Sequence, residues 1–181
     1  MRYSNVAEAV AGTCMLLSTS SQIKTTQDSI IQAIAGTWTL LNTTTTRNGV
    51  LVENVYGISP VGILLYTVDG YMSATITSTH PQDRPAALSF PPRADQSDSD
   101  WATIAKRSIS YAGPFVINDQ VPTTETSGQI FHGPLTVANV PSWIGTKQVR
   151  NYTLYENGRL LFITSKREDG SEGQLWWTRS T

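Results

Sequence analysis

The sequence has few of the residues that build disulfides and metal sites. Its only cysteine is Cys14, and its only histidines are His80 and His132. One cysteine cannot form a disulfide within the chain, and these side chains are too few for a Cys/His zinc site. We therefore expect no metal ion, and an oxidising, disulfide-forming compartment loses support.

Charge of one sign and long apolar runs are also missing. The 13 Lys and Arg balance 14 Asp and Glu without any block of like charge, so we expect no nucleic-acid partner and no attraction to an anionic membrane. Near the N-terminus the continuous apolar run covers only residues 14–17, too short for a membrane span or the core of a signal peptide. We expect no membrane span and a cytoplasmic location, with secretion as the alternative.

The length of the chain fits one domain with a real core rather than two. Near its start, Val6, Val10, Cys14 and Leu17 recur at helical spacing and form one stripe. This pattern predicts a short helix within an N-terminal extension, residues 1–27. A single domain is expected over residues 28–181.

Beyond residue 35 the sequence consists of short runs rich in β-branched and aromatic residues, separated by turns. An apolar lead-in over residues 30–34 is compatible with one helical turn. Many short strands with almost no helix predict an all-β fold, either a closed barrel or a sandwich. Strands are expected over residues 36–46, 50–56, 61–67, 71–79, 113–118, 129–140, 147–155, 160–166 and 173–178.

Two segments interrupt the strands. Residues 80–97 contain four prolines and cannot form the interior of a strand, so they are expected to be a surface loop of the kind used as a lid. Residues 99–110 place Trp101, Ile104 and Ile109 at helical spacing. They are expected to form one helix.

Several motifs in the same order resemble the lipocalin-like domain proteins of fungi and bacteria. They are Gly36-Thr37-Trp38, YTVDGYMSA at 66–74, Tyr111-Ala112-Gly113, VPSWIGTKQVRNYTL at 140–154, and the final Leu175, Trp177 and Arg179. The similarity covers residues 30–180. It implies a small calycin-type, antiparallel up-and-down barrel of about eight to nine strands around a central cavity.

The resemblance also implies roles for certain residues and for the cavity. In lipocalins the tryptophan of the first strand packs under an arginine from the last strand, so Trp38 and Arg179 are expected to close the barrel. Fungal members often accompany pathways to polyketides or terpenoids, and some related barrels close rings without a cofactor. This implies a small hydrophobic molecule as the partner and no cofactor.

Turn lengths decide which side chains face the cavity. At the hairpin of residues 66–74, a three-residue loop over 68–70 places Leu64 and Tyr66 with Met72, whereas a two-residue loop would place Ile63 and Leu65 there. We favour the first alternative. The expected inward side chains are then Leu64, Tyr66, Met72, Ala74 and Ile76. On the strand over 129–140, Ile130, His132, Thr136 and Ala138 face inward if the chain does not bulge at residues 133–134.

The same choice arises near the C-terminus. A two-residue turn at Asn157-Gly158 would pair Leu154 with Leu161, whereas the favoured three-residue loop over 156–158 pairs Leu154 with Leu160. A two-residue Asp169-Gly170 turn then follows. This register places one set inward: Arg150, Tyr152, Leu154, Leu160, Phe162, Thr164, Leu175, Trp177 and Arg179. The opposite face would carry Leu161, Ile163 and Trp176, which makes a homodimer conceivable.

The inward set is mostly apolar with a few polar groups, as in sites for small molecules. The candidate catalytic residues are His132 for proton transfer, Arg150 for stabilising an oxyanion, and Tyr152, with Tyr66, as a hydrogen-bond donor. The alternatives are a histidine bonded within the wall, an arginine in an ion pair at the barrel mouth, and tyrosines that serve packing. The candidate substrate-binding residues are Leu64, Tyr66, Met72, Ala74, Ile76, Leu154, Phe162 and Trp177.

Three functions remain open at this level. The leading hypothesis is a cofactor-independent enzyme of secondary-metabolite biosynthesis that binds a hydrophobic polyketide or terpenoid intermediate and promotes its cyclisation or isomerisation. The alternative is a carrier that binds such a compound without changing it. A purely structural, dimerising domain is the third.

Overall fold

The computed structural model describes residues 26–167 and 169–180 of the chain. The helix predicted around Val6 and Leu17 lies outside these residues. The described part contains a helix over residues 26–34, helix α2 (Asp98–Lys106) and the short 3-10 turns η1 (Pro81–Asp83), η2 (Pro141–Trp143) and η3 (Glu156–Gly158). Its strands are β1 (Gly36–Arg47), β2 (Val50–Val52), β3 (Val61–Tyr66), β4 (Tyr71–Thr77), β5 (Ser108–Ile117), β6 (Ser127–His132), β7 (Val137–Ala138), β8 (Gln148–Tyr155), β9 (Leu160–Lys166) and β10 (Ser171–Arg179).

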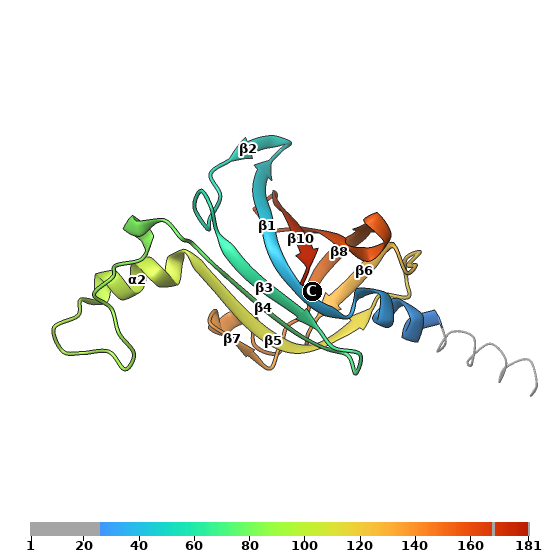
Figure 1. The fold of residues 1–181 in the computed structure, drawn as a ribbon, viewed down its shortest axis with the longest axis horizontal. Helices are drawn as coiled ribbons and strands as arrows, with labels where there is room; N and C mark the ends of the chain where they lie inside the picture. The colour runs from blue at the N-terminus through green and yellow to red at the C-terminus, as the bar shows by residue number, and fades with distance from the viewer. Residues whose placement is uncertain (1–25, 168, 181) are drawn as a thin grey trace, which may run out of the picture.

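Within the described residues, eight of these strands form a closed antiparallel barrel. Neighbouring strands follow the order β1, β3, β4, β5, β6, β8, β9 and β10, and β10 pairs with β1 to complete the circle. Strand β2 pairs with the C-terminal end of β1, and β7 pairs with β5. Figure 1 shows the strands curving around a central space, with α2 on one side and the helix over 26–34 on the other. The all-β barrel predicted from the sequence is confirmed.

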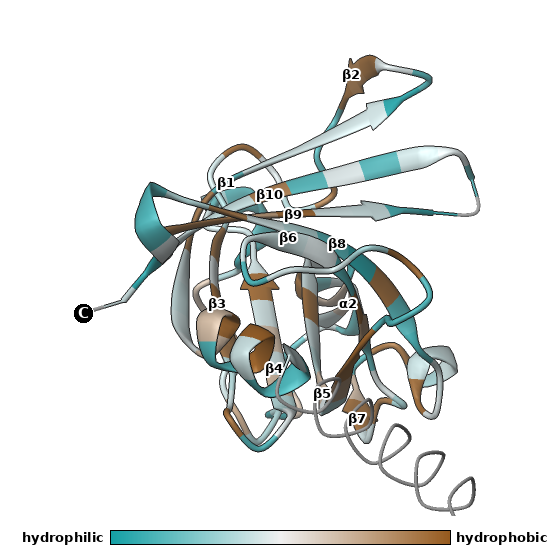
Figure 2. Cartoon of the chain, turned by 90° about the vertical axis from the view of Figure 1, so that its right-hand side faces the viewer, coloured by the Kyte–Doolittle hydropathy of each residue, from teal (hydrophilic) through white to brown (hydrophobic). Residues whose placement is uncertain are grey.

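Alternation along the strands supplies the core. In β4, Met72, Ala74 and Ile76 are buried, whereas the alternate residues Tyr71 and Thr75 are exposed and Ser73 is half-buried. Figure 2 shows the resulting bands of differing hydropathy along several strands. Because successive side chains point to opposite faces, one apolar face per strand is enough to fill the inside of the barrel.

Helix α2 is shorter than the sequence predicts. It begins after its N-cap Ser97 and ends at Lys106, rather than continuing to residue 110. Strand β5 therefore starts at Ser108, five residues earlier than the predicted start at 113. The reason is pairing with β4, which aligns Ile109 with Ile76 and buries Ile109 inside the barrel. Tertiary pairing overrides the local helical spacing here.

The sequence predicts one strand where the structure has β6 and β7. The backbone leaves the extended conformation at Gly133, whose φ is 121°. The alternation consequently shifts by one residue, so that Leu135 is buried and Thr136 is exposed. The condition for an inward Thr136, that the chain does not bulge at residues 133–134, is therefore not met, whereas Ile130 and His132 before the break are buried as predicted. The strand predicted over 50–56 is also shorter and ends at Val52.

One end of the barrel is closed around Trp38 and Arg179. Trp38 is completely buried, and the guanidinium carbon of Arg179 lies 4.2 Å from the centre of its ring. The same guanidinium donates hydrogen bonds to the carbonyls of Ala33, Ala35 and Gly158. The expected cation–π contact is present, and hydrogen bonds also tie it to the N-terminal helix and the η3 turn.

Gly36 explains why a glycine stands two residues before this tryptophan. Its φ is 137°, and a Cβ atom placed there would lie 2.6 Å from Nη1 of Arg179. An L-residue with a side chain rarely adopts this backbone conformation, and here it would also displace the guanidinium. The Gly-Thr-Trp motif is therefore a requirement of barrel closure.

The hairpin between β3 and β4 has the predicted register. Tyr66 pairs with Met72, and the three-residue loop over 68–70 ends at Gly70, whose φ is 86°. The backbone N–H of Gly70 donates to the carbonyl of Thr67, and Thr67 in turn pairs with Tyr71. Leu64, Tyr66, Met72, Ala74 and Ile76 are all buried, as predicted.

The register of β8 and β9 differs from the preferred one. Leu154 pairs with Leu161 rather than Leu160, and η3 occupies the connection. As a result Leu161 and Ile163 are buried, whereas Phe162 faces outward and stacks on Trp176 with ring centres 4.5 Å apart. The inward placement of Leu160, Phe162 and Thr164 was wrong.

A second error at the next turn cancels the first. The connection between β9 and β10 is a three-residue loop, because Arg167 and Ser171 bond across it, and not the predicted two-residue turn. Two shifts of one residue restore the original face, so Trp177 and Arg179 lie inside as predicted. The predicted outer apolar face loses Leu161 and Ile163, and a homodimer stays a prediction with less support.

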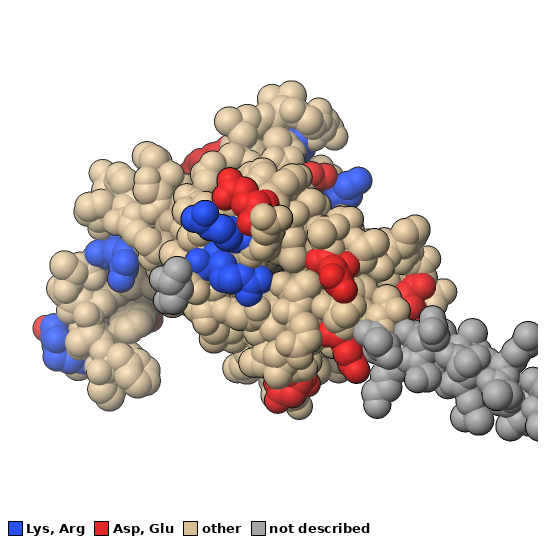
Figure 3. Space-filling model, turned by 45° about the vertical axis from the view of Figure 1, so that its right-hand side comes forward, with Lys and Arg blue, Asp and Glu red and all other residues tan. Residues whose placement is uncertain are grey.

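The loop over residues 80–97 lies on the same side of the barrel as α2 (Figure 1). Arg93 forms hydrogen bonds within this loop, because it donates to Ser89, Asp95 and the carbonyl of Ala87. No helix in the described ranges is long and apolar enough to cross a membrane. Figure 3 shows basic and acidic side chains scattered over a mostly uncharged face.

We expect Arg179→Met to lower the free energy of unfolding by about 2–4 kcal/mol, because the cation–π contact and several charged hydrogen bonds are lost together. Arg179→Lys should recover part of this loss, since it keeps the charge without the planar fork. Urea denaturation measures both. The exposed Arg159 near the same end is the control, and Arg159→Met should change stability by less than about 0.5 kcal/mol. Equal effects at the two positions would contradict the closure role of Arg179.

Candidate functional site

The barrel encloses an open cavity of about 950 Å³. Its apolar wall includes side chains from β3, β4, β5, β9 and β10, which the alternation of these strands turns inward. Its polar side chains come mainly from β5, β6 and β8 and from the connections at the open end. Such a volume and such a mixed lining are typical of sites for small molecules. The apolar lining comprises Leu64, Ala74, Ile76, Ile109, Ile163, Leu175 and Trp177, among others.

Three side chains from strands β3, β5 and β6 form a hydrogen-bonded chain inside the barrel. The hydroxyl of Tyr66 lies 2.6 Å from Nε2 of His132, and the hydroxyl of Tyr111 lies 3.3 Å from Nδ1 of the same ring. Strands β3, β6 and β5 supply these residues in turn. His132 is only 1 % exposed, and both its nitrogens are engaged. The hydrogen bonds of His132 therefore agree with the alternative to a catalytic role, a histidine bonded within the barrel wall.

Burial sets the protonation of this chain. Loss of solvation, and then the positive charge of Arg150, hold the pKa of His132 well below its usual 6.5, so the ring is neutral. Burial is also the main reason that the pKa of Tyr66 is raised well above 10.0. At the other side of the cavity, burial raises the pKa of Tyr56 to about 12. These groups therefore act as neutral donors and acceptors near neutral pH.

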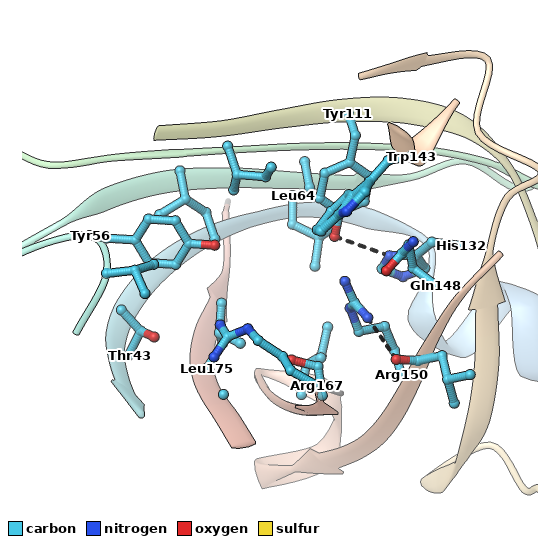
Figure 4. Close-up of a pocket in the computed structure, with 18 of the residues that line it drawn as sticks. Thr43, Tyr56, Leu64, Tyr111, His132, Trp143, Gln148, Arg150, Arg167 and Leu175 are labelled. Atoms are coloured by element: carbon cyan, nitrogen blue, oxygen red, sulfur yellow. Dashed lines mark hydrogen bonds between the residues drawn. The ribbon is translucent and has the colours of Figure 1, made fainter. Parts of the chain in front are cut away.

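Arg150 on β8 enters the cavity without a carboxylate partner. Its Nη1 donates to the carbonyl of Val149 at 2.7 Å, and no Asp or Glu within residues 26–167 and 169–180 forms an ion pair with it. Figure 4 shows its guanidinium facing the same space as the ring of His132 and the hydroxyl of Tyr111. The ion pair considered for Arg150 is thus not found in the described part.

Of the predicted catalytic residues, His132 and Arg150 line the cavity and Tyr152 does not. The Tyr152 side chain is buried, but its hydroxyl donates to the backbone carbonyl of Thr124. Burial raises its pKa to about 12, so it is a poor acid near neutral pH. Tyr152 therefore has a structural place in the wall.

The predicted substrate-binding residues divide into two groups. Leu64, Ala74, Ile76 and Trp177 line the cavity. The others do not: Tyr66 and Met72 are buried in the wall, Leu154 packs against the core, and Phe162 faces outward. The loop over 80–97 contributes no lining residue either, so its expected role as a lid finds no support in this arrangement.

Several lining residues were missed in the sequence. Tyr56 lies at the end of the segment for which the sequence predicts a strand, after β2 has ended at Val52. Trp143 lies in the η2 turn, after the break at Gly133. The ring of Trp143 packs edge-on against Tyr111, with centres 5.5 Å apart. Neither position has a strand alternation that could have revealed it. Arg167 sits in a hairpin loop whose length was misjudged.

The described residues contain no group of three or more His, Cys, Asp or Glu side chains that could hold a metal ion. The indole N–H of Trp177 is buried and has no hydrogen-bond partner in the described structure. The site thus offers hydrogen-bond donors and a cation to a ligand, within a largely apolar cavity.

A closed antiparallel up-and-down barrel with an internal cavity is the architecture of lipocalins, among other barrel proteins. The family model described as a lipocalin-like domain matches residues 35–180. The chain therefore belongs to the lipocalin-like domain family. No curated protein gives a significant match.

Similar solved structures are designed barrels. A redesigned β-barrel is 16 % identical, covering 84 % of this chain and 96 % of its own, with a TM-score of 0.39. A de novo designed fluorescence-activating β-barrel is 11 % identical, covering 84 % of this chain and 98 % of its own, also with a TM-score of 0.39.

The neutral, buried His132 predicts a pH-dependent stability. Because the pKa of the ring is lower in the folded state than the unfolded value of 6.5, the unfolded chain binds the extra proton first as the pH falls. The contribution of neutral His132 to the free energy of unfolding is fully present above pH 6.5. It decreases below pH 6.5, by up to about 1.4 kcal/mol per pH unit. Urea denaturation across this range should show a smaller loss in His132→Gln. The variant His80→Gln is the control and should keep the wild-type dependence, whereas an unchanged slope in His132→Gln would contradict the burial argument.

Proposed function

We propose that the protein binds a small, largely apolar molecule inside its barrel. The observation that carries this proposal is the cavity of about 950 Å³, which combines an apolar lining with hydrogen-bond donors and with Arg150, a cation that has no carboxylate partner among the described residues. Empty apolar space is destabilising, and a ligand that fills it regains the lost contacts. The family membership agrees with this function.

The proposal is tested by filling the cavity from one of its own strands. Ala74 lines the cavity, and the neighbouring Ser73 points to the outside of the same strand. We expect the neutral fluorescent probe N-phenylnaphthylamine to bind the wild type, and Ala74→Phe to weaken that binding by about tenfold or more, since the ring occupies ligand space. Ser73→Phe is the matched control and should bind normally.

A second pair of variants controls for the possibility that Ala74→Phe loses binding because it misfolds. Thr43 also lines the cavity and Thr44 beside it does not, so Thr43→Phe and Thr44→Phe form an independent pair. Circular dichroism establishes that each variant is folded. Loss of binding in both members of a pair, or failure of the wild type to bind the probe, would contradict a ligand site inside the barrel.

A second candidate is a cofactor-independent enzyme of secondary-metabolite biosynthesis that cyclises or isomerises a polyketide or terpenoid intermediate. It is favoured by the guanidinium of Arg150, which has no carboxylate partner among the described residues and faces the same partly desolvated cavity as the hydroxyl of Tyr111 (Figure 4). Such donors stabilise negative charge that develops on a carbonyl oxygen. His132 has both nitrogens engaged, so it would orient Tyr111 rather than transfer protons.

The enzyme proposal requires turnover as well as binding. A panel of carbonyl-containing linear polyketides and terpenoids is incubated with the wild type, Arg150→Ala and His132→Ala, and product rate and stereochemistry are measured. We expect Arg150→Ala to reduce the rate about a hundredfold and His132→Ala to reduce it less. Arg159→Ala, on the outside, is the control. If compounds bind to the wild type but none reacts faster, the enzyme proposal is contradicted and the binding proposal is retained.

A further inference from the structure

Among the residues that the structure describes, the charged side chains that line the cavity are almost all cationic. Five described lining residues are cations and one, Asp169, is an acid, although the whole chain has 13 Lys and Arg against 14 Asp and Glu. Asp169 is already paired with Arg47 at 2.7 Å. The cavity therefore has an electrostatic preference that the net charge of the protein does not show. The lining cations are Lys106, Lys147, Arg150, Lys166 and Arg167.

These cations differ in their surroundings. Lys106, Lys147, Lys166 and Arg167 are exposed, so water and salt screen them. Arg150 is half-buried and is close enough to the buried His132 and Tyr66 to affect the pKa of each. The exposed cations can attract an anion to the opening, whereas Arg150 is placed to bind it inside.

The Tyr66–His132–Tyr111 chain adds a donor with a fixed direction. A neutral imidazole has one N–H donor and one acceptor nitrogen. Tyr66 is buried outside the lining and has no other hydrogen-bond partner in the described structure, so its O–H must donate to Nε2 or remain unpaired at high cost. Nδ1–H then donates to the oxygen of Tyr111. The O–H of Tyr111, which does line the cavity, is left to donate to a ligand.

A third donor lies in the same cavity. Trp177 is only 2 % exposed, it lines the cavity, and its indole N–H has no acceptor in the described structure. Buried donors without partners are rare, because each one loses its hydrogen bonds to water.

The geometry points to a ligand that is an apolar molecule carrying one anionic oxygen group, namely a carboxylate, enolate or phenolate. Arg150 and the O–H of Tyr111 both donate hydrogen bonds to that group. This inference rests on the proposed binding function and adds the chemical class of the ligand. In this arrangement Tyr66 and His132 are positioning residues, because they act through Tyr111 and do not contact the ligand.

A matched pair of probes tests the chemical class of the ligand separately from the binding function. Dansyl-labelled undecanoic acid and its methyl ester share the same apolar body and differ in the carboxylate. We expect the wild-type protein to bind the acid at least about tenfold more tightly than the ester at about pH 7, since a charged hydrogen-bonded pair forms only with the acid. Added salt should weaken binding of the acid alone.

Variants assign this preference to residues. Arg150→Gln should bring the acid-to-ester ratio close to one without changing ester affinity, and Arg150→Lys should keep part of the ratio. Tyr111→Phe should lower it about threefold or more. Arg159→Gln and Tyr155→Phe, on the outside of the barrel, are the controls and should keep the wild-type ratio.

Every outcome decides the inference. Equal binding of acid and ester by the wild type overturns it and leaves the proposed binding function intact. A full preference for the acid in Arg150→Gln also overturns it, because the anion would then be held elsewhere. If neither probe binds, the binding function itself fails, and the inference fails with it.

Discussion

The contact between Arg179 and Trp38 is the constraint on which the rest of the barrel depends. It joins the last strand to the first, and the same guanidinium reaches carbonyls before β1 and in the turn before β9. A sheet that closes on itself has no free edge, but it must still exclude water from one end if the other end is to hold a ligand. The tryptophan fills that end, and the arginine covers it while satisfying carbonyls that would otherwise be buried unpaired.

A closed end allows the remaining length of the barrel to be left partly empty. The fully buried residues Trp38, Ile34 and Leu161 pack a continuous core at one end, whereas the cavity occupies the rest. In the part of the chain that the structure describes, the cavity contains a guanidinium without a carboxylate partner and its wall contains an indole N–H without an acceptor, and both lower the stability of the folded chain. Features that lower the stability of a fold are characteristic of functional sites, and here both belong to residues that line the cavity, Arg150 and Trp177.

The barrel itself could be predicted because its signals are local and repeated. The short alternating strands and the three-residue hairpin loop ending at Gly70 each depend on a few neighbouring residues. The errors arose where the number of residues in a loop sets the face of a whole strand. One misjudged residue at η3 turned Phe162 inward in the prediction, and a second at residues 168–170 turned Trp177 back to its correct face. Alternation alone cannot detect such a pair of errors, because it is conserved by any even shift.

The site was harder to predict than the fold because its polar residues come from places without periodicity. His132 and Arg150 were accessible, since both lie on regular strands. Tyr56 and Trp143 stand in irregular connections, where sequence does not indicate the direction of a side chain. The Tyr66–His132–Tyr111 chain depends on β3 and β6 lying across the barrel from each other in the correct registers, with β4 and β5 between them along the sheet. Only the closed structure brings those side chains together.

The arrangement of these groups also limits what chemistry the cavity can perform. A histidine whose two nitrogens are bonded to tyrosines, and whose pKa burial holds well below its ordinary value, has neither a free lone pair nor a readily gained proton. General acid–base catalysis needs a group poised near the working pH, which this ring is not. Arg150 and Tyr111 instead offer fixed charge and a fixed donor, which serve equally to hold an anion and to stabilise one that forms during a reaction. Binding and catalysis in this barrel would therefore use the same two groups, and they would differ only in whether the negative charge is present before the ligand enters.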